Sequence, residues 1–414
     1  MTKQMQDIIA ECKKSGKPFK TVPSLSELVD TNVKISQLRD VSIVDLLGRE
    51  EINLDKTSID KLIRGKRIVI TGAGGSIGSE LVRQCMKFNP SVLVMIDNSE
   101  LNLFEIEREV TSLEYPILFK PVLADIRDYD MIVQIFKEFE PQIVFHAAAY
   151  KHVPMQENFP WEAVKTNVFG TSNLSNISVN YNVEKFVLVS TDKAVRPANV
   201  MGATKRIAEM IIQNYNRINK NTDFMAVRFG NVLGSSGSVI PIFQEQIKNG
   251  GPITITDPAM ERYFMSIPEA SQLILQAGSL GLGGEVFILD MGEPIKIVDI
   301  ANELIRLSGY EPELDISIKF TGARPGEKKV EELSLEREQS DKTKHEKIFV
   351  LNDPGITDEV LSKVYTRVRE LKTDLQKKTP IEIRYKLSEI LPEYNPESKS
   401  NNIILSGIKS DDLN

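Results

Sequence analysis

From Lys66 onward, short runs of apolar and β-branched residues alternate with longer segments whose apolar positions recur at helical spacing. A strand with one solvent-exposed face alternates apolar and polar residues, but these runs are apolar throughout. They therefore predict parallel strands covered on both faces. The segments between them predict crossover helices. The predicted strands are 67–71, 92–96, 117–122, 142–146 and 185–190, and the predicted helices are 76–88, 100–113, 128–139, 157–180 and 199–219.

This alternation predicts an α/β fold, a doubly wound parallel sheet of the Rossmann type with a smaller C-terminal substrate-binding domain. After Arg228 the pattern breaks into Gly- and Pro-rich segments with helices near 268–279 and 296–308. Ligands of such sheets bind where the strands end. We expect an N-terminal extension packed on the core at 1–64, the Rossmann domain at 65–230, the substrate-binding domain, interleaved with the last strands, at 231–394 and a disordered tail at 395–414.

Composition narrows the classes of partner. Lys and Arg total 51 against 58 Asp and Glu, a formal charge of -7. The net charge of the chain therefore does not favour binding to nucleic acid or to an anionic membrane. The two cysteines and three histidines lack disulfide or metal-site spacing, and we expect no metal. Because no run of about 18 apolar residues occurs, we expect a soluble, cytoplasmic chain.

A glycine-rich turn follows the first predicted strand and opens the first predicted helix. Gly72, Gly75 and Gly78 permit a tight turn, close approach to a pyrophosphate and close packing of helix on strand. Ser76 and Ile77 lie at the helix N-terminus, where free N–H groups bind phosphate. The turn therefore predicts a dinucleotide site.

An acid ends the second predicted strand. Asp97 is placed to accept hydrogen bonds from the adenine-ribose hydroxyls, and 98–100 supply no cation for a 2′-phosphate, which favours NAD over NADP. The alternative is that Asp97 simply caps the following helix.

Two further strand ends complete the predicted cofactor site. Asp125 and Ile126 follow the third strand and are expected beside the adenine. Ala147 and Ala148 follow the fourth, where small side chains let the cofactor approach. His146 ends an apolar strand and is interpreted as a core histidine.

The fifth predicted strand ends in Ser190 followed by Thr191, Asp192 and Lys193. An acid beside an amine at the cofactor face can protonate a leaving hydroxyl and remove a carbon-bound proton, as a β-elimination requires. The alternative is two solvated charges on a loop.

Three runs resemble a known family: 146–154, 191–195 and 199–206. They are similar to the extended short-chain dehydrogenase/reductases and, more closely, to the CapD-like nucleotide-sugar 4,6-dehydratases, over roughly 18–386. The resemblance implies that Lys205 holds the nicotinamide ribose of NAD. It also places Met201 where a catalytic tyrosine is usual, and a thioether has no proton to exchange.

The resemblance implies 4,6-dehydration of UDP-N-acetylglucosamine for bacterial polysaccharide synthesis, with a GDP-linked sugar as the alternative nucleotide. Lys193 would remove the proton on sugar carbon 5, Asp192 would protonate the departing 6-hydroxyl, and Thr191 would relay the 4-hydroxyl proton or orient the sugar. Relatives commonly carry membrane helices ahead of this part, so the chain is expected to be a soluble relative or a soluble fragment. It is expected to form a homo-oligomer through 157–180 and 199–219.

The same resemblance points to substrate-binding residues, all but one of them in the second half of the chain. Small residues around Asn231 would expose N–H groups to a diphosphate, and guanidinium groups suit phosphate oxygens. The general alternative for the arginines is an ordinary surface role. The predicted substrate-binding residues are Lys151, Asn231, Ser235, Arg262, Arg324 and Glu327.

Two other functions fit parts of the sequence. A nucleotide-sugar 4-epimerase shares the fold but needs no acid and base for eliminating water. The presence of Asp192 and Lys193 therefore disfavours an epimerase. A catalytically silent NAD-binding module would account for Met201 alone.

Overall fold

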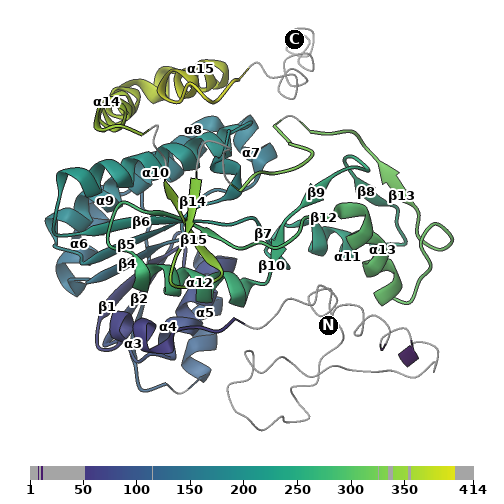
Figure 1. Cartoon of the computed structure of the whole chain (residues 1–414), viewed down its shortest axis with the longest axis horizontal. Coiled ribbons are helices and arrows are strands. Elements are labelled where there is room, and N and C mark those ends of the chain that lie inside the picture. The colour runs from purple at the N-terminus through teal and green to yellow at the C-terminus, as the bar shows by residue number, and fades with distance from the viewer. Residues whose placement is uncertain are drawn as a thin grey trace. The chain divides into compact units, whose positions relative to one another are not determined.

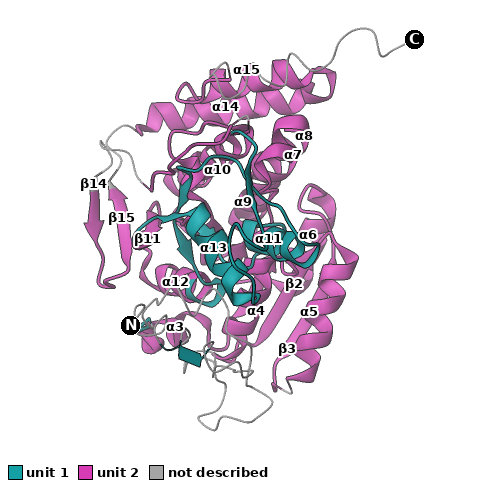
Figure 2. Ribbon diagram, turned by 90° about the vertical axis from the view of Figure 1, so that its right-hand side faces the viewer, with its two compact units in different colours: residues 1–54, 231–269, 293–322 teal, residues 55–230, 270–292, 323–414 magenta. Residues whose placement is uncertain are grey.

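The computed structural model describes residues 8, 11–12, 52–113, 115–324, 326–333, 339–352 and 356–396. Most of the predicted extension 1–64 and of the predicted disordered tail 395–414 therefore lies outside the described residues. The chain forms two compact units, one of residues 1–54, 231–269 and 293–322 and the other of residues 55–230, 270–292 and 323–414, coloured separately in Figure 2.

A nine-stranded sheet forms the centre of the larger unit (Figure 1). Seven neighbouring strands run parallel, and an antiparallel hairpin continues one edge. This arrangement confirms the predicted doubly wound α/β fold. In spatial order the strands are β14 (Gln339–Lys342), β15 (Ile348–Asn352), β11 (Val286–Leu289), β6 (Asp223–Arg228), β5 (Lys185–Val189), β4 (Ile143–His146), β1 (Arg67–Thr71), β2 (Val92–Asp97) and β3 (Leu118–Leu123).

Helices cover both faces of this sheet (Figure 1). On one face lie α6 (Tyr129–Phe139), α9 (Thr171–Asn180) and α10 (Val200–Ile218), and on the other lie α3 (Lys56–Ile63), α4 (Ser76–Met86), α5 (Glu100–Ser112) and α12 (Ile267–Leu280).

One predicted strand differs in burial. The run 117–122 was expected to be covered on both faces, but β3 is the edge strand, and Leu118 and Leu123 are 53% and 57% exposed. Its apolar residues are like those of a central strand, and only the topology shows that no strand of the described residues lies beyond it. Pro121, which lacks an N–H donor, is typical of such an edge.

The predicted helix 157–180 is four consecutive pieces. They are α7 (Val153–Asn158), α8 (Pro160–Ala163), the π-helical segment η2 (Val164–Gly170) and α9. Pro160 has no N–H to continue the ladder from α7, which explains the first break.

The predicted domain 231–394 is divided between the two units. Residues 270–292 and 323–396 group with the larger unit because β11 pairs with β6 and β15 pairs with β11. The smaller unit has its own apolar core. Its elements are β7 (Asn231–Val232), α11 (Val239–Lys248), β8 (Ile253–Ile255), β9 (Glu261–Arg262), β10 (Phe264–Met265), β12 (Ile295–Lys296), α13 (Ile297–Leu307) and β13 (Ile318–Phe320).

The chain itself covers the outer face of α10. Helices α14 (Asp358–Asp374) and α15 (Pro380–Ile390) pack on it, and the Tyr215 and Tyr365 hydroxyls lie 3.0 Å apart. Arg206 reaches Glu393 at 3.2 Å. A homo-oligomer remains a prediction, but the expected contact through 199–219 would compete with this packing.

None of the helices in the described part of the chain combines the length and apolar character that a membrane span requires.

Candidate active site

The glycine turn has the geometry that the sequence predicts. Gly72 has φ +67°, and a Cβ there would lie 2.7 Å from the backbone of Ala148. Gly75 is the N-cap of α4, and a Cβ on Gly78 would overlap with the carbonyl oxygen of Gly72. Glycine at these positions therefore lets α4 start directly against β1.

A pocket of about 320 Å³ opens beside this turn. Its walls come from the carboxyl ends of β1, β2, β3 and β4 and from η2. Ser76, Ile77 and Gly78 begin α4 and are not among the lining residues. The predicted cofactor residues that line the pocket are Gly72, Gly75, Asp97, Asp125, Ile126, Ala147 and Ala148.

Asp97 ties the glycine turn to the end of β2. Its Oδ2 accepts a hydrogen bond from the Gly74 N–H at 2.9 Å, and its Oδ1 accepts one from the Ser99 N–H at 2.9 Å. Ser99 is the residue that caps α5, through its bond from the Asn102 N–H. The helix-cap alternative for Asp97 is therefore wrong.

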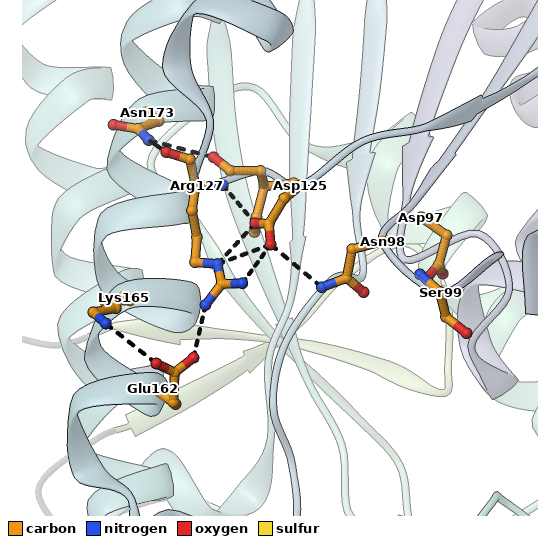
Figure 3. Close-up of polar contacts among 9 residues, drawn as sticks. Asp97, Asn98, Ser99, Asp125, Arg127, Glu162, Lys165 and Asn173 are labelled. Atoms are coloured by element: carbon orange, nitrogen blue, oxygen red, sulfur yellow. Dashed lines mark hydrogen bonds and ion pairs between the residues drawn. The ribbon is translucent and has the colours of Figure 1, made fainter.

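An arginine that contacts the pocket-lining Asp125 is paired with acids (Figure 3). The Arg127 guanidinium binds the Asp125 carboxylate, with Nη2 donating to Oδ2 at 2.6 Å, and its Nη1 donates to Glu162 Oε2 at 2.7 Å. Asn98 adds a longer bond to Asp125. Burial alone would raise the pKa of Asp125, but the hydrogen bonds from Arg127 lower it overall.

Sequence reasoning missed the part of the wall that η2 supplies. The Thr166 hydroxyl is buried, lines the pocket and has no hydrogen-bond partner among the described residues. Next to it, Asn167 accepts from the Tyr150 N–H at 2.9 Å and donates to Thr204 at 3.1 Å. A π-helical turn changes which side chains share one face of a helix. The prediction of a single regular helix over 157–180 therefore could not show that Thr166 faces the pocket.

The predicted chemical residues lie just after β5. The Asp192 side chain is fully buried, and its Oδ1 accepts from Thr191 Oγ1 at 2.8 Å and from Lys193 Nζ at 3.0 Å. Its Oδ2 is buried without a partner in the described part of the chain. The alternative of two solvated charges is therefore wrong for Asp192.

Met201 and Lys205 lie one turn apart on α10, and both are buried. Lys205 Nζ donates to the carbonyl oxygen of Val189 at 2.7 Å. Burial lowers the pKa of Lys205 to about 8, against a smaller opposing effect of Glu209. The lysine thus lies at the end of β5, next to the residues that the elimination would use.

A buried acid that the sequence analysis did not identify holds the end of β5. Glu209 on α10 accepts from Ser190 Oγ at 2.6 Å, from Arg228 Nη2 at 2.8 Å and from Arg206 Nη1 at 3.1 Å. Glu209 and Arg228 are both fully buried. The network joins Ser190, at the end of β5, to β6 and α10.

The predicted substrate residues belong to both units. In the larger unit, Lys151 and Arg324 are exposed, and the Arg324 N–H donates to Glu327 Oε2 at 3.0 Å. In the smaller unit, β7 begins at Asn231 and β9 ends at Arg262, and Arg262 Nη1 donates to the Glu261 carbonyl oxygen. Ser235 is buried in the loop after β7. Their roles in binding remain predictions.

Known proteins similar to this chain include enzymes of sugar metabolism. The capsular polysaccharide biosynthesis protein CapD of Staphylococcus aureus is 49% identical over 348 residues, 84% of this chain and 58% of that protein. The chain thus spans little more than half of this curated relative. A UDP-glucose 4-epimerase of Rickettsia akari is 35% identical over 276 residues, 65% of this chain and 77% of that enzyme.

A solved structure supports the fold. The crystal structure of a DesIV double mutant, a dTDP-glucose 4,6-dehydratase of Streptomyces venezuelae with NAD bound, matches with a TM-score of 0.57 at 22% identity, over 65% of this chain and 88% of that one. Residues 68–353 match the family described as Polysaccharide biosynthesis protein. The match to this family and the identity with CapD confirm the CapD-like resemblance, and the chain belongs to the polysaccharide biosynthesis protein family.

Proposed function

We propose that this chain is an NAD-dependent 4,6-dehydratase of nucleotide-linked N-acetylglucosamine, with UDP as the favoured nucleotide. The observation that carries the proposal is the contact between the buried Asp192 and the partly buried Lys193 at the end of β5. Both lie close in the chain to a helix on which Met201 stands where a tyrosine is expected. The site keeps an acid and an amine but has no phenol at the usual position. Those are the groups an elimination needs.

The pocket lies where the adenosine and pyrophosphate of a dinucleotide would bind. Gly72 and Gly75 leave room for backbone approach, and the buried Thr166 hydroxyl has an unused hydrogen-bonding capacity that a bound base or ribose can satisfy. Arg127 is engaged by Asp125 and Glu162, which favours NAD over NADP. When bound, NAD supplies the acceptor and donor of the hydride that moves from sugar carbon 4 to carbon 6.

The contacts of Asp192 suggest a balanced path for the protons. Thr191 Oγ1, which already donates to Asp192 Oδ1, passes the proton of the sugar 4-hydroxyl to that carboxylate. Asp192 gives the proton to the departing 6-hydroxyl, which leaves as water. Lys193, as the neutral amine, takes the proton from carbon 5 and returns it to that carbon after the elimination.

The identity with a UDP-glucose 4-epimerase makes epimerisation the second candidate. An epimerase must exchange a proton at the 4-hydroxyl but has no use for a base that removes the proton of carbon 5 or for an acid that protonates the 6-hydroxyl. Lys193 and Asp192 can supply this base and this acid, so dehydration is favoured.

The test is to incubate the purified chain with UDP- or GDP-N-acetylglucosamine and to follow the product by mass spectrometry. Dehydration removes one water. Epimerisation leaves the mass unchanged but changes the sugar at carbon 4, which NMR detects, and a silent module leaves both unchanged. If neither sugar nucleotide loses water, the proposed function is wrong.

A further inference from the structure

The connection between the chemical residues and α10 carries a second set of contacts. Residues 195–199 lead from η3 (Asp192–Ala194) to α10, and Asn199 is the N-cap of that helix. The Asn199 side chain is 3% exposed, and its Oδ1 accepts a hydrogen bond from the Gly202 N–H at 2.8 Å. This hydrogen bond is the one that an asparagine at an N-cap usually makes.

The amide nitrogen of the same side chain contacts a segment far away in the sequence. Asn199 Nδ2 donates to the carbonyl oxygen of Gly326 at 2.9 Å. Gly326 has φ +78°, and a Cβ there would lie 2.7 Å from the Cβ of Asn199. Only glycine allows this approach, so the contact depends on both residues.

Two more contacts join the same two segments. Lys328 Nζ donates to the carbonyl oxygen of Val195 at 2.9 Å, and Arg196 lies 3.2 Å from Glu332. The second is exposed and contributes little. Residues 326–332 therefore lie along the whole connection, and the buried Asn199 contact is the most specific of the three.

Gly326 belongs to the turn that presents two predicted substrate residues. The Arg324 N–H donates to Glu327 Oε2, and the Glu327 N–H donates to the Arg324 carbonyl oxygen at 3.1 Å. These bonds fix the turn internally, whereas Asn199 fixes it against the start of α10.

We propose that Asn199 is a positioning residue, which sets the Arg324–Glu327 turn in register with Lys193 for binding of the nucleotide diphosphate. The inference rests on the proposed function, because it takes the turn to contact the nucleotide. Asn199 itself need not touch the substrate. Its amide nitrogen, rather than its capping oxygen, carries this role.

Asn199→Asp separates the two roles. Aspartate keeps the oxygen that accepts from the Gly202 N–H and is an equally good N-cap. It replaces the amide donor by a second oxygen facing the Gly326 carbonyl oxygen. Gly326→Ala tests the same contact from the other side and leaves the cap of α10 unchanged.

The experiment measures binding of UDP and of GDP to the full chain by calorimetry, together with kcat, KM, bound NAD and the urea midpoint. For both variants we expect about tenfold weaker binding of the nucleotide that wild type prefers, with a matching rise in KM. Bound NAD should not change. The urea midpoint should fall in Asn199→Asp, because a buried oxygen then faces the Gly326 carbonyl oxygen, so unchanged NAD content is the control for an intact fold.

Wild-type nucleotide affinity in either variant, even with a lowered urea midpoint, would show that Asn199 only caps the helix and would overturn the inference. Failure of the proposed function would be seen separately, as a wild-type chain that binds neither nucleotide or removes no water from either sugar. If Asn199→Asp does not fold, Gly326→Ala alone decides between the outcomes.

Discussion

Gly202 on α10 lies directly against the carbonyl oxygen of Lys193, so close that a Cβ at position 202 would overlap with it. Both contacting groups are backbone, and neither can rotate away. The absence of a side chain at one position in the first turn of α10 therefore sets how near the helix comes to the chemical residues.

Gly202→Ala should push α10 and the Lys193 backbone apart. We expect a loss of about 1–3 kcal/mol in the free energy of unfolding, as for other overpacked sites. We also expect kcat to fall more than KM rises, because the displaced group acts in the reaction. Urea unfolding and steady-state kinetics measure both, and an unchanged kcat would show that the contact does not position Lys193.

Lys193→Ala should abolish water loss and leave NAD bound, because the glycine turn and Asp97, which line the predicted cofactor pocket, are unchanged in this variant. Lys193→Arg is the matched control. It keeps a positive charge beside Asp192 but cannot act as a neutral base, since a guanidinium does not deprotonate in proteins.

If Lys193 is the base, both variants should be inactive while retaining NAD, as mass spectrometry of the product and the absorbance of released cofactor would show. Substantial activity in Lys193→Arg would mean that the charge, and not proton removal, is what the site requires.

Glu209→Gln should destabilise the chain strongly, because it leaves Arg228 and Arg206 buried with one negative charge fewer between them. Breaking a buried ion pair typically costs about 3–5 kcal/mol. Glu393→Gln is the control, since that acid also contacts Arg206 but is 22% exposed, and its loss should cost less than about 1 kcal/mol. Similar losses for both variants, measured by urea unfolding, would contradict a special role for Glu209.

The sequence predicted what depends on local chemistry. Continuous apolar runs predicted the parallel strands, and the glycine spacing predicted a tight turn with the helix close to the strand. In the structure Gly78 packs on Gly72. The sequence placed Asp192 beside Lys193 at a strand end, but adjacency alone does not bring two side chains together; in the structure they meet at η3 (Asp192–Ala194).

The contacts that could not be predicted from the sequence form between segments that are far apart in the chain. Glu209 is one acid among many until β5, β6 and α10 bury it against Arg228. Thr166 faces the pocket because η2 changes the helical register, and Asn199 reaches Gly326 across 127 positions of the chain. None of these contacts leaves a periodic pattern or a motif.

His146 predicts a pH dependence of stability. It is buried between the Thr71 and Thr171 hydroxyls, at 2.8 and 2.9 Å, and burial, aided by the charge of Lys205, lowers its pKa to about 3 from the ordinary value of 6.5. Between these two values the unfolded chain binds a proton that the folded chain does not, so stability falls as the pH falls.

From pH 7.5 to pH 5.5 this one group should remove about 1.4 kcal/mol from the free energy of unfolding. His146→Gln keeps a polar side chain but cannot titrate, so the variant, although less stable throughout, should lose about that much less over the same interval. His152 and His345 are present in both proteins and cancel in the comparison. Urea unfolding at the two pH values measures the difference, and equal losses in both proteins would show that the fold does not lower the pKa of His146.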